Sequence, residues 1–445
     1  MAAGSVGNPI EHLIILMMEN RSFDHYFGGL SLLEGRTDVE GLSRALPGCP
    51  DAGGHLVAPW RLDGTPPTYP DLPHGWEDSH SEYHAGANDG FVVRYQQASP
   101  AADPRIPMGY YTRQTLPVLY ALVDVFTVCD HWFSSVLSST WPNRKYLHSG
   151  RRDGDNDTQD IPPFGFQTRP LYDVLEDTIG PSGDRLTWNC YFTDLPFLGF
   201  WYAFAATHLR NFRSVVDFAR DCAEDALPTV SIVDPPFTVA DDHPAHDPLL
   251  GQKFIGLIVD ALTHSESWAK SALLILYDEG GGFYDHVPPP APAETPASPD
   301  QPLGFRVPAV VVSPFAKRRH SCKTVFDHTS VMKSINVRWG VPFGSEFGGR
   351  WPSANHLWAD GFDFSGPPLP PASYTSDAPE ILSLNWGSGV RQQLSRLPDG
   401  FLARLERIYL LPELKPLDRR ANVFDTLVEL EQQVITSKRL MRQRP

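Results

Sequence analysis

The sequence is short of cysteine pairs, long apolar runs and export signals, and each shortage excludes a class of protein. Its five cysteines are widely spread and form no C-x-x-C pair, which argues against a zinc ribbon or a redox motif. No stretch reaches the roughly 18 apolar residues that a membrane span needs. Residues 1–9 hold no basic cluster followed by an apolar core. A soluble, cytoplasmic protein is therefore expected, with secretion the alternative if the sequence is truncated.

Positive charge is also scarce. The 53 acidic residues exceed the 37 basic ones, for a formal net charge of −16. Nucleic acid would meet repulsion over most of such a surface, so no nucleic-acid partner is expected. A bound metal ion can still be the largest charge within a site, and an anionic substrate would need such a centre here. The oligomeric state is left open by the sequence.

Short, continuous apolar runs predict buried strands of a parallel sheet. Four such runs are present: Leu13–Met18, Val230–Val233, Ala272–Tyr277 and Val307–Val312. Between and after them, 249–263 and 327–339 have helical spacing. Strands that alternate with helices predict an α/β fold, in which helices cover both faces of a core sheet.

Prolines and glycines concentrate in two long segments, about 36–110 and 345–390, which we expect to form loops or a cap over the core. Residues 402–411 and 423–434 are typical of two amphipathic helices in a C-terminal tail. The predicted organisation is a catalytic core over 1–345, including the loop-rich insertion, and a segment over 346–445 whose loops and helices pack on it.

Metal-type oxygen ligands follow the two strongest strands. Glu19 and Asn20 come directly after the first run, and Asp278 and Glu279 follow the third. In open α/β sheets, ligands bind beyond the carboxyl ends of strands, so the two pairs are predicted to converge. Carboxylate and amide oxygens suit a hard or borderline divalent cation. A single pair of this kind is more often a solvated strand end, but two pairs at equivalent places favour a site.

A hydroxyl near a predicted helix start is the third element. Pro142 suits the first turn of a helix, and Thr140 is expected just before it as a capping residue. The amides of a helix N-terminus favour phosphate, and a metal or base can activate a hydroxyl as a nucleophile. An isolated Thr-x-Pro would more often be only a cap. Three groups of histidines could hold a phosphate or protonate a leaving oxygen: His74, His80 and His84; His243 and His246; and His286.

Four motifs in order make the sequence similar to a known family. They are ENRSFDHYFG (Glu19–Gly28), SSTWPNR (Ser138–Arg144), DDHP (Asp241–Pro244) and YDEGGGFYDHV (Tyr277–Val287). They resemble the phosphoesterase family that contains bacterial acid phosphatases and the non-specific phospholipases C of bacteria and plants. The resemblance implies an alkaline-phosphatase-like α/β core. It further implies one divalent metal held by Glu19, Asn20, Thr140, Asp278 and Glu279.

By the same resemblance, Thr140 forms a covalent phospho-enzyme, while His243 and either His74 or His80 hold the phosphate or assist the leaving group. Asn143, Arg144 and His286 are expected to bind substrate. Gly280 departs from the plant enzymes, which carry His there, and no large C-terminal extension like that of some secreted bacterial enzymes follows. The metal could be calcium, magnesium, manganese or zinc.

Three functions are compatible with these residues. The first is a metal-dependent phosphoesterase of phospholipase C type, with phospholipid among its candidate substrates. The second is an acid-phosphatase-like phosphomonoesterase that acts on small soluble substrates. The third, and least favoured, is a non-catalytic binding protein stabilised by a metal, because a structural site has no need of a placed hydroxyl beside histidines.

Overall fold

The computed structural model describes residues 7–64, 68–158, 162, 164–292 and 302–375. Its centre is an eight-stranded mixed sheet in the order β12-β6-β11-β10-β1-β9-β7-β8. Along the chain these strands are β1 (His12–Met18), β6 (Thr127–Cys129), β7 (Trp188–Phe192), β8 (Phe212–Ser214), β9 (Val230–Val233), β10 (Ser271–Tyr277), β11 (Ala309–Val312) and β12 (His320–Cys322).

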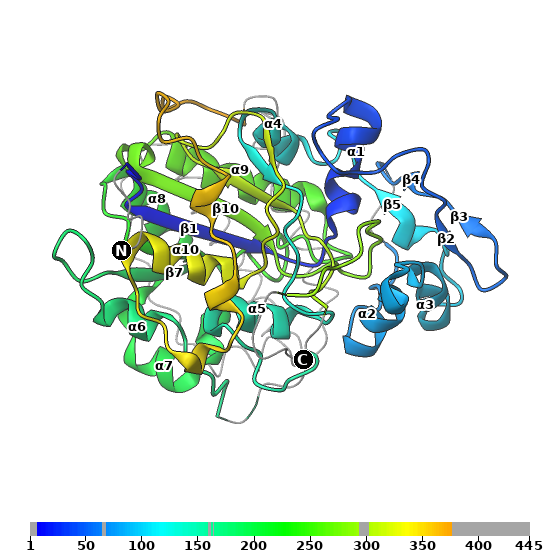
Figure 1. Cartoon of the computed structure of the whole chain (residues 1–445), viewed down its shortest axis with the longest axis horizontal. Coiled ribbons are helices and arrows are strands. Elements are labelled where there is room, and N and C mark those ends of the chain that lie inside the picture. The colour runs from blue at the N-terminus through cyan, green and yellow to red at the C-terminus, as the bar shows by residue number, and fades with distance from the viewer. Residues whose placement is uncertain (1–6, 65–67, 159–161, 163, 293–301, 376–445) are drawn as a thin grey trace, which may run out of the picture.

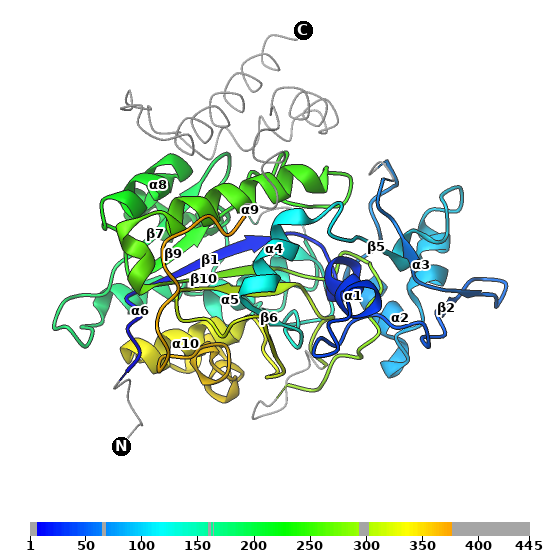
Figure 2. The same cartoon turned by 90° about the horizontal axis from the view of Figure 1, so that it is seen from above.

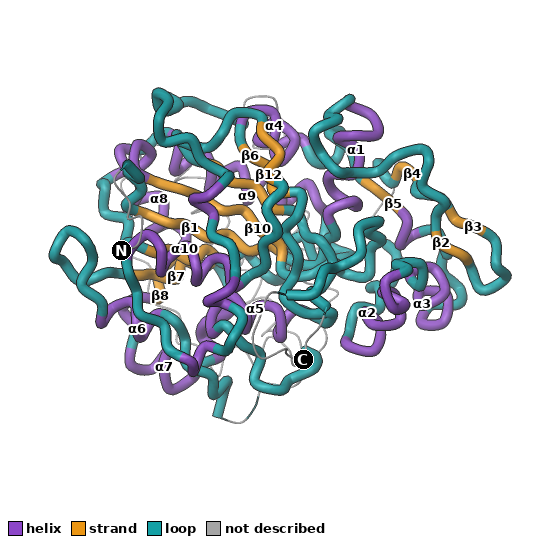
Figure 3. Tube along the Cα trace, viewed as in Figure 1, coloured by secondary structure: helices purple, strands orange, loops and turns teal. Residues whose placement is uncertain are grey.

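Helices cover both faces of this sheet, as predicted (Figures 2 and 3). On one face α9 packs against α4 and α8, and on the other α10 packs against α5. The helices of the core are α1 (Phe23–Glu34), α4 (Pro117–Val125), α5 (Thr140–Ser149), α6 (Tyr172–Asp177), α7 (Tyr202–Thr207), α8 (Val215–Ala223), α9 (Pro248–Thr263) and α10 (Thr329–Trp339). The expected helices at 249–263 and 327–339 correspond to α9 and α10.

The two strongest predicted strands lie side by side. β1 pairs in parallel with β10 along its whole length, with Met18 opposite Tyr277, and every residue of both strands is buried. A parallel strand covered on both faces needs a continuous apolar sequence, which explains both runs. β11 departs from the expectation of parallel strands, since it runs antiparallel to β10 and to β6. An apolar run reports burial and carries no information on strand direction.

The insertion at 36–110 forms a cap with elements of its own. Figure 1 shows them gathered at the side toward which β1 runs, beyond the carboxyl ends of the central strands. They are β2 (Cys49–Pro50), β3 (Leu56–Val57), β4 (Trp60–Arg61), α2 (Trp76–Tyr83), α3 (Phe91–Ala98) and β5 (Gly109–Tyr110). β2 pairs with β3 and β4 pairs with β5. The cap is therefore placed over the strand ends where ligands bind in α/β sheets.

Short 3-10 turns complete the described chain: His84–Gly86, Ile106–Met108, Phe197–Phe200, Leu209–Asn211, Glu266–Lys270, Ser345–Phe347, Trp351–Ser353 and Leu357–Ala359. The last two pack against α10. The helices expected at 402–411 and 423–434 lie outside the described residues, and the division at residue 345 stays a prediction. Within the described ranges, no helix is both long enough and apolar enough to cross a membrane.

Candidate active site

The four predicted metal ligands meet at the carboxyl ends of β1 and β10. The register brings Glu19 and Asn20 next to Asp278 and Glu279, although about 258 positions separate the pairs in sequence. The backbone amide of Asn20 donates to Asp278 Oδ1 at 2.9 Å. All four side chains are buried. The structure thus brings together the donors that the strand-end argument placed there.

Asn20 holds an unusual backbone conformation. Its φ is +58°, in the left-handed region that few residues other than glycine occupy. The neighbouring loop accommodates it through Gly281, where an added Cβ would lie 2.1 Å from the Asn20 carbonyl oxygen. One glycine of the Gly280–Gly282 run is therefore needed for the close approach of these two backbone segments. Backbone strain of this kind concentrates at ligand sites.

Thr140 reaches the same centre from α5. Its hydroxyl donates to Asn20 Oδ1 at 3.2 Å, and the residue is only 9% exposed. The helix begins one residue earlier than predicted: Thr140 is its first residue and Ser139 is the N-cap. Pro142 has no amide hydrogen, and the Trp141 amide donates to Thr158 Oγ1 at 3.2 Å. The first turn of α5 therefore offers a bound anion fewer free backbone amides than the sequence predicted. The backbone amide of Thr140 is the one next to its own hydroxyl.

Asn143 has a structural role in the loop before α5, and its predicted contact with substrate stays a prediction. Its Oδ1 accepts the Val136 amide at 3.0 Å, and its Nδ2 donates to the carbonyl oxygens of Val136, Ser138 and Ser139 at 2.9–3.2 Å. Both the oxygen and the nitrogen of this side-chain amide are thus hydrogen-bonded to backbone groups of the loop before α5. Asn143 fixes the loop that carries Thr140.

The side chain of Arg144 is fully buried against the acids. Nε donates to Asp278 Oδ2 at 3.0 Å, and Nη2 lies 3.3 Å from Glu19 Oε1. The same nitrogen donates to the carbonyl oxygens of Met17 and Met18 at 3.2 and 3.3 Å. These contacts hold the ends of both strands together. The geometry makes Arg144 a positioning residue for the acids, and its predicted contact with substrate stays a prediction.

The buried carboxyl groups of this centre are suited to a bound cation. Burial raises the pKa of Glu19 well above its usual value even though Arg144 opposes the shift. Burial also raises the pKa of Glu279 to about 8, against the opposing effect of His74. Glu279 Oε1 is buried and has no hydrogen-bond partner among the described residues. Three carboxyl groups beside one guanidinium, one of them with a buried oxygen that lacks a hydrogen bond, fit a divalent cation held by oxygen ligands.

The structure distinguishes between His74 and His80, the two histidines between which the sequence could not choose. His74 Nε2 lies 3.7 Å from Glu279 Oε1 and 3.4 Å from Asn20 Nδ2. Burial lowers the His74 pKa, but the carboxylates of Glu279 and Asp71 more than offset this and raise it to about 9. His80 instead packs against Trp76 with the two rings tilted by 35° and their centroids 4.3 Å apart, and its Nδ1 donates to the Trp76 carbonyl. His74 is therefore the histidine of this stretch that faces the acids.

We predict that His74→Ala lowers kcat/KM by at least about 10²-fold, the usual scale for loss of an acid–base or positioning group. His80→Ala should leave kcat/KM within about twofold, because His80 contacts its own helix and none of the acids. Steady-state kinetics of both variants on one substrate would check this. Equal losses for the two variants would contradict the assignment.

His243 lies beside His74, with ring centroids 6.2 Å apart, so the DDHP motif reaches the same place. Asp241 of this motif supports the site through its backbone, since its carbonyl oxygen accepts the Glu19 amide at 2.8 Å. The Asp241 carboxylate binds Nδ1 of His246. Sequence reasoning singled out the motif and counted His246 among the histidines that could contact phosphate, but it gave Asp241 no role. Asp241 and His246 lie within six residues of each other, and this short spacing of an acid and a histidine was the sequence feature that could have identified the pair.

His286 contacts a different cluster. Its Nδ1 bonds Asp24 Oδ2 at 2.6 Å, and the buried Arg306 guanidinium donates to both Asp24 and Asp285, at 3.1 and 2.8 Å. Asp24, Asp285 and His286 have the spacing of a metal site, but Arg306 already supplies the positive charge. This network ties the loop after β10 to α1. His286 thus makes a structural contact with Asp24, and its expected contact with substrate stays a prediction.

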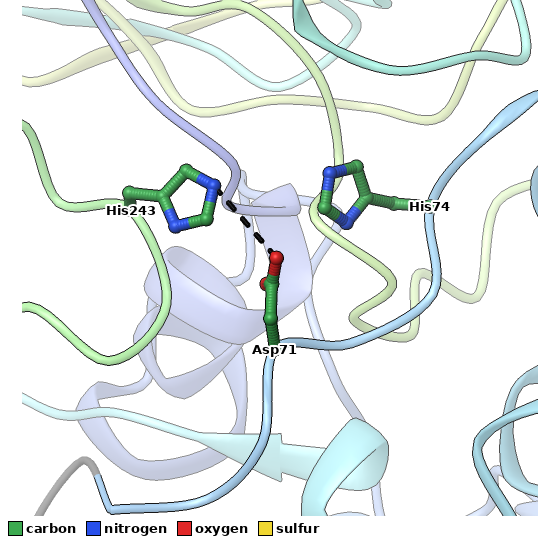
Figure 4. Close-up of side chains that lie close together, drawn as sticks. All are labelled: Asp71, His74 and His243. Atoms are coloured by element: carbon green, nitrogen blue, oxygen red, sulfur yellow. Dashed lines mark ion pairs between the residues drawn. The ribbon is translucent and has the colours of Figure 1, made fainter. Parts of the chain in front are cut away.

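Asp71 is the site residue that sequence reasoning missed. It lies three positions before His74, on the cap loop that leads to α2, and its Oδ2 is 4.0 Å from His243 Nε2 (Figure 4). Asp71, His74 and His243 each offer one ligand atom, and all three atoms lie within 4.8 Å of one another. A D-x-x-H pattern was visible in the sequence. Only the fold brings His243 to it.

Comparison with known proteins is consistent with this geometry. A sequence profile described as the phosphoesterase family matches residues 10–342. The chain is 32% identical over 422 residues to phospholipase C B of Mycobacterium tuberculosis (strain ATCC 25618 / H37Rv), covering 81% of this chain and 79% of that one. It is 34% identical over 393 residues to phospholipase C A of the same strain, covering 75% and 73%.

Among solved structures, the chain is similar to the lipoteichoic acid synthase LtaP from Listeria monocytogenes. The TM-score is 0.38 at 10% identity, over 86% of this chain and 94% of that one. The family profile spans the four motifs and every strand-end ligand described above. The chain therefore belongs to the phosphoesterase family, and it is a hydrolase that acts on phosphoester bonds.

Proposed function

We propose that the protein is a metal-dependent phosphoesterase of phospholipase C type that works through a phospho-threonine intermediate. The observation that carries this proposal is the place of Thr140. Its hydroxyl, at the start of α5, lies 3.2 Å from Asn20 Oδ1 within the group of acids at the ends of β1 and β10. A hydroxyl that served only as a helix cap would have no reason to face this centre.

The residues that would hold the metal are the five oxygen donors predicted from the sequence, Glu19, Asn20, Thr140, Asp278 and Glu279. A divalent cation bound there supplies positive charge that favours the ionised hydroxyl and stabilises negative oxygens on phosphorus. The donor set contains oxygen alone, which suits calcium, magnesium or manganese. Arg144 keeps Glu19 and Asp278 in place from the buried side.

The reaction proceeds in two displacements at phosphorus. Thr140 Oγ1 gives up its proton to solvent and attacks, an Oγ1–P bond forms, and the bond from phosphorus to the leaving oxygen breaks. His74 and His243 lie at the same centre, where an imidazole can donate the proton that the leaving oxygen takes up. Water then attacks the phosphorus of the phospho-threonine, the bond from Oγ1 to phosphorus breaks, and Oγ1 takes up a proton as the attacking water gives one up. Each in-line displacement inverts phosphorus.

Two inversions predict net retention of configuration. A substrate made chiral at phosphorus with oxygen isotopes, turned over in isotopically labelled water, would give a product whose configuration ³¹P NMR can assign. Retention supports the covalent intermediate. Inversion would mean that water attacks the substrate directly and that Thr140 is not the nucleophile.

The phospholipase C relatives favour a diester substrate such as a phospholipid, which would release a phosphorylated head group. Activity on phosphatidylcholine vesicles and on bis-p-nitrophenyl phosphate, with weaker activity on p-nitrophenyl phosphate, is the expected result. Preference for the monoester would select the second candidate, a phosphomonoesterase acting on small soluble substrates. Both candidates share the Thr140 chemistry and differ in the walls of the pocket.

A further inference from the structure

A buried aspartate precedes the histidine of the DDHP motif. The side chain of His243 is 28% exposed and faces Asp71 (Figure 4), whereas Asp242 is completely buried. Burial raises the pKa of Asp242 to about 7, although Arg21 and the Tyr277 hydroxyl oppose the shift. An acid is costly to bury, and acids with a perturbed pKa concentrate at functional sites. The proposed reaction gives Asp242 no part.

Two hydrogen bonds anchor Asp242, one through its carboxyl group and one through its backbone. Tyr277 Oη donates to Asp242 Oδ2 at 2.5 Å, and Arg21 Nε donates to the Asp242 carbonyl oxygen at 2.7 Å. Both anchors adjoin oxygen donors of the site, because Tyr277 directly precedes Asp278 and Arg21 directly follows Asn20. Asp242 therefore ties the DDHP loop to the ends of both strands that carry these donors.

The backbone of this loop needs such anchors. The angle φ is +72° at Asp242 and +79° at Ala245, both in the left-handed region that few residues other than glycine occupy. Conformations of this kind persist where surrounding contacts fix them. Helix α9 makes room for the carboxyl group, since an added Cβ at Gly251 would lie 1.8 Å from Asp242 Oδ1. The place of His243, between the two left-handed residues, thus depends on how Asp242 is held.

We propose that Asp242 is a positioning residue that holds the His243 imidazole at a fixed place relative to the oxygen donors. The loop itself orients the ring, because His243 Nδ1 donates to the Pro244 carbonyl oxygen at 3.0 Å. Asp242 then fixes the loop against both strand ends. The inference rests on the proposed function, in which His243 assists the leaving oxygen. A shift of about 1 Å in such a group can lower the rate on the order of 10²-fold.

A double-mutant cycle between Asp242→Asn and His243→Ala tests the proposal. Asn tolerates the left-handed region as Asp does, so the exchange removes the carboxyl group with little change in shape or backbone preference. Asp242→Asn should lower kcat/KM by about 10-fold or more in the unmodified chain, and by less than about twofold when His243 is already Ala. Steady-state kinetics of the two single variants and the double variant would measure this coupling.

The identity of the leaving group supplies a second readout. The four proteins of the cycle are compared on a p-nitrophenyl ester and an alkyl ester of whichever class, diester or monoester, the protein prefers. An alkyl oxygen needs a proton as it leaves, whereas p-nitrophenolate leaves as a stable anion. Asp242→Asn and His243→Ala should therefore both lose more activity on the alkyl ester. A general loss of structure would lower both activities equally.

Tyr277→Phe is the second variant, because it removes only the hydroxyl that donates to Asp242. It should lower kcat/KM in the same direction and lose more on the alkyl ester. Tyr191→Phe is the matched control: Tyr191 Oη donates to Asp221 Oδ2 at 2.6 Å, in a buried pair that joins β7 to α8. This control should keep kcat/KM within about twofold on both esters.

Additive losses for Asp242→Asn and His243→Ala, or equal losses on the two esters, would overturn the proposal. If Asp242→Asn does not fold, the same cycle with Tyr277→Phe decides in the same way. Either result leaves the phospho-threonine mechanism intact, since that mechanism stands on Thr140. Conversely, a fully active Thr140→Val variant would contradict the mechanism without removing the coupling between Asp242 and His243. The cycle and the nucleophile test therefore fail separately.

Discussion

Replacing Thr140 by Val should lower kcat by a factor on the order of 10⁴ or more, as for loss of the nucleophile in other covalent hydrolases. Val keeps the size and the β-branch of Thr but has no hydroxyl to attack phosphorus. The side chain is buried, and the one hydrogen bond that is lost goes to Asn20 Oδ1. Steady-state kinetics on bis-p-nitrophenyl phosphate would measure the loss.

Thr140→Ser is the matched control, because it keeps the hydroxyl and should retain far more activity than Thr140→Val. Acid quench during turnover of bis-p-nitrophenyl phosphate followed by peptide mass spectrometry should find a p-nitrophenyl phosphoryl group on residue 140 in the unmodified chain and in Thr140→Ser. Thr140→Val should show none. A folded Thr140→Val variant with normal turnover would show that another group attacks phosphorus.

The core of the site could be predicted from the sequence because it depends on strand ends. An apolar run long enough for a strand fixes where the strand stops, and the next two residues must then lie at the sheet edge. Glu19 and Asp278 were placed correctly for this reason. Thr140 depended on the motif resemblance, since its spacing alone was equally typical of a helix cap. In the structure, Ser139 takes that position.

The contacts of buried polar side chains could not be predicted. The sequence shows that Asn143 and Arg144 follow Thr140, but not that α5 turns both of them toward the protein interior. Likewise, β11 has the composition of a parallel strand and runs antiparallel. Asp71 joins His243 only through the path of the cap over the sheet. These features depend on tertiary packing, which local sequence patterns do not encode.

Arg144→Met should destabilise the protein by about 3–5 kcal/mol, the usual cost of removing one partner from a buried ion pair. Met fills much of the volume of the Arg side chain, so the loss reports charge more than packing. Glu19 and Asp278 would be left buried without their guanidinium, and two strand-end carbonyl groups would lose a donor. Urea unfolding at equilibrium would measure the free energy of unfolding.

The matched control lies just beyond the same helix. Arg151→Met removes a surface arginine that pairs with the exposed Asp153, and such a pair contributes below about 1 kcal/mol. The destabilisation of Arg144→Met should be larger in chelator than in excess calcium, because a cation at the oxygen donors offsets part of the charge that Arg144 leaves behind. Equal stability of the two variants would show that Arg144 does not hold the acids together. A loss that is independent of calcium would show that Arg144 and the metal do not act on the same carboxylates.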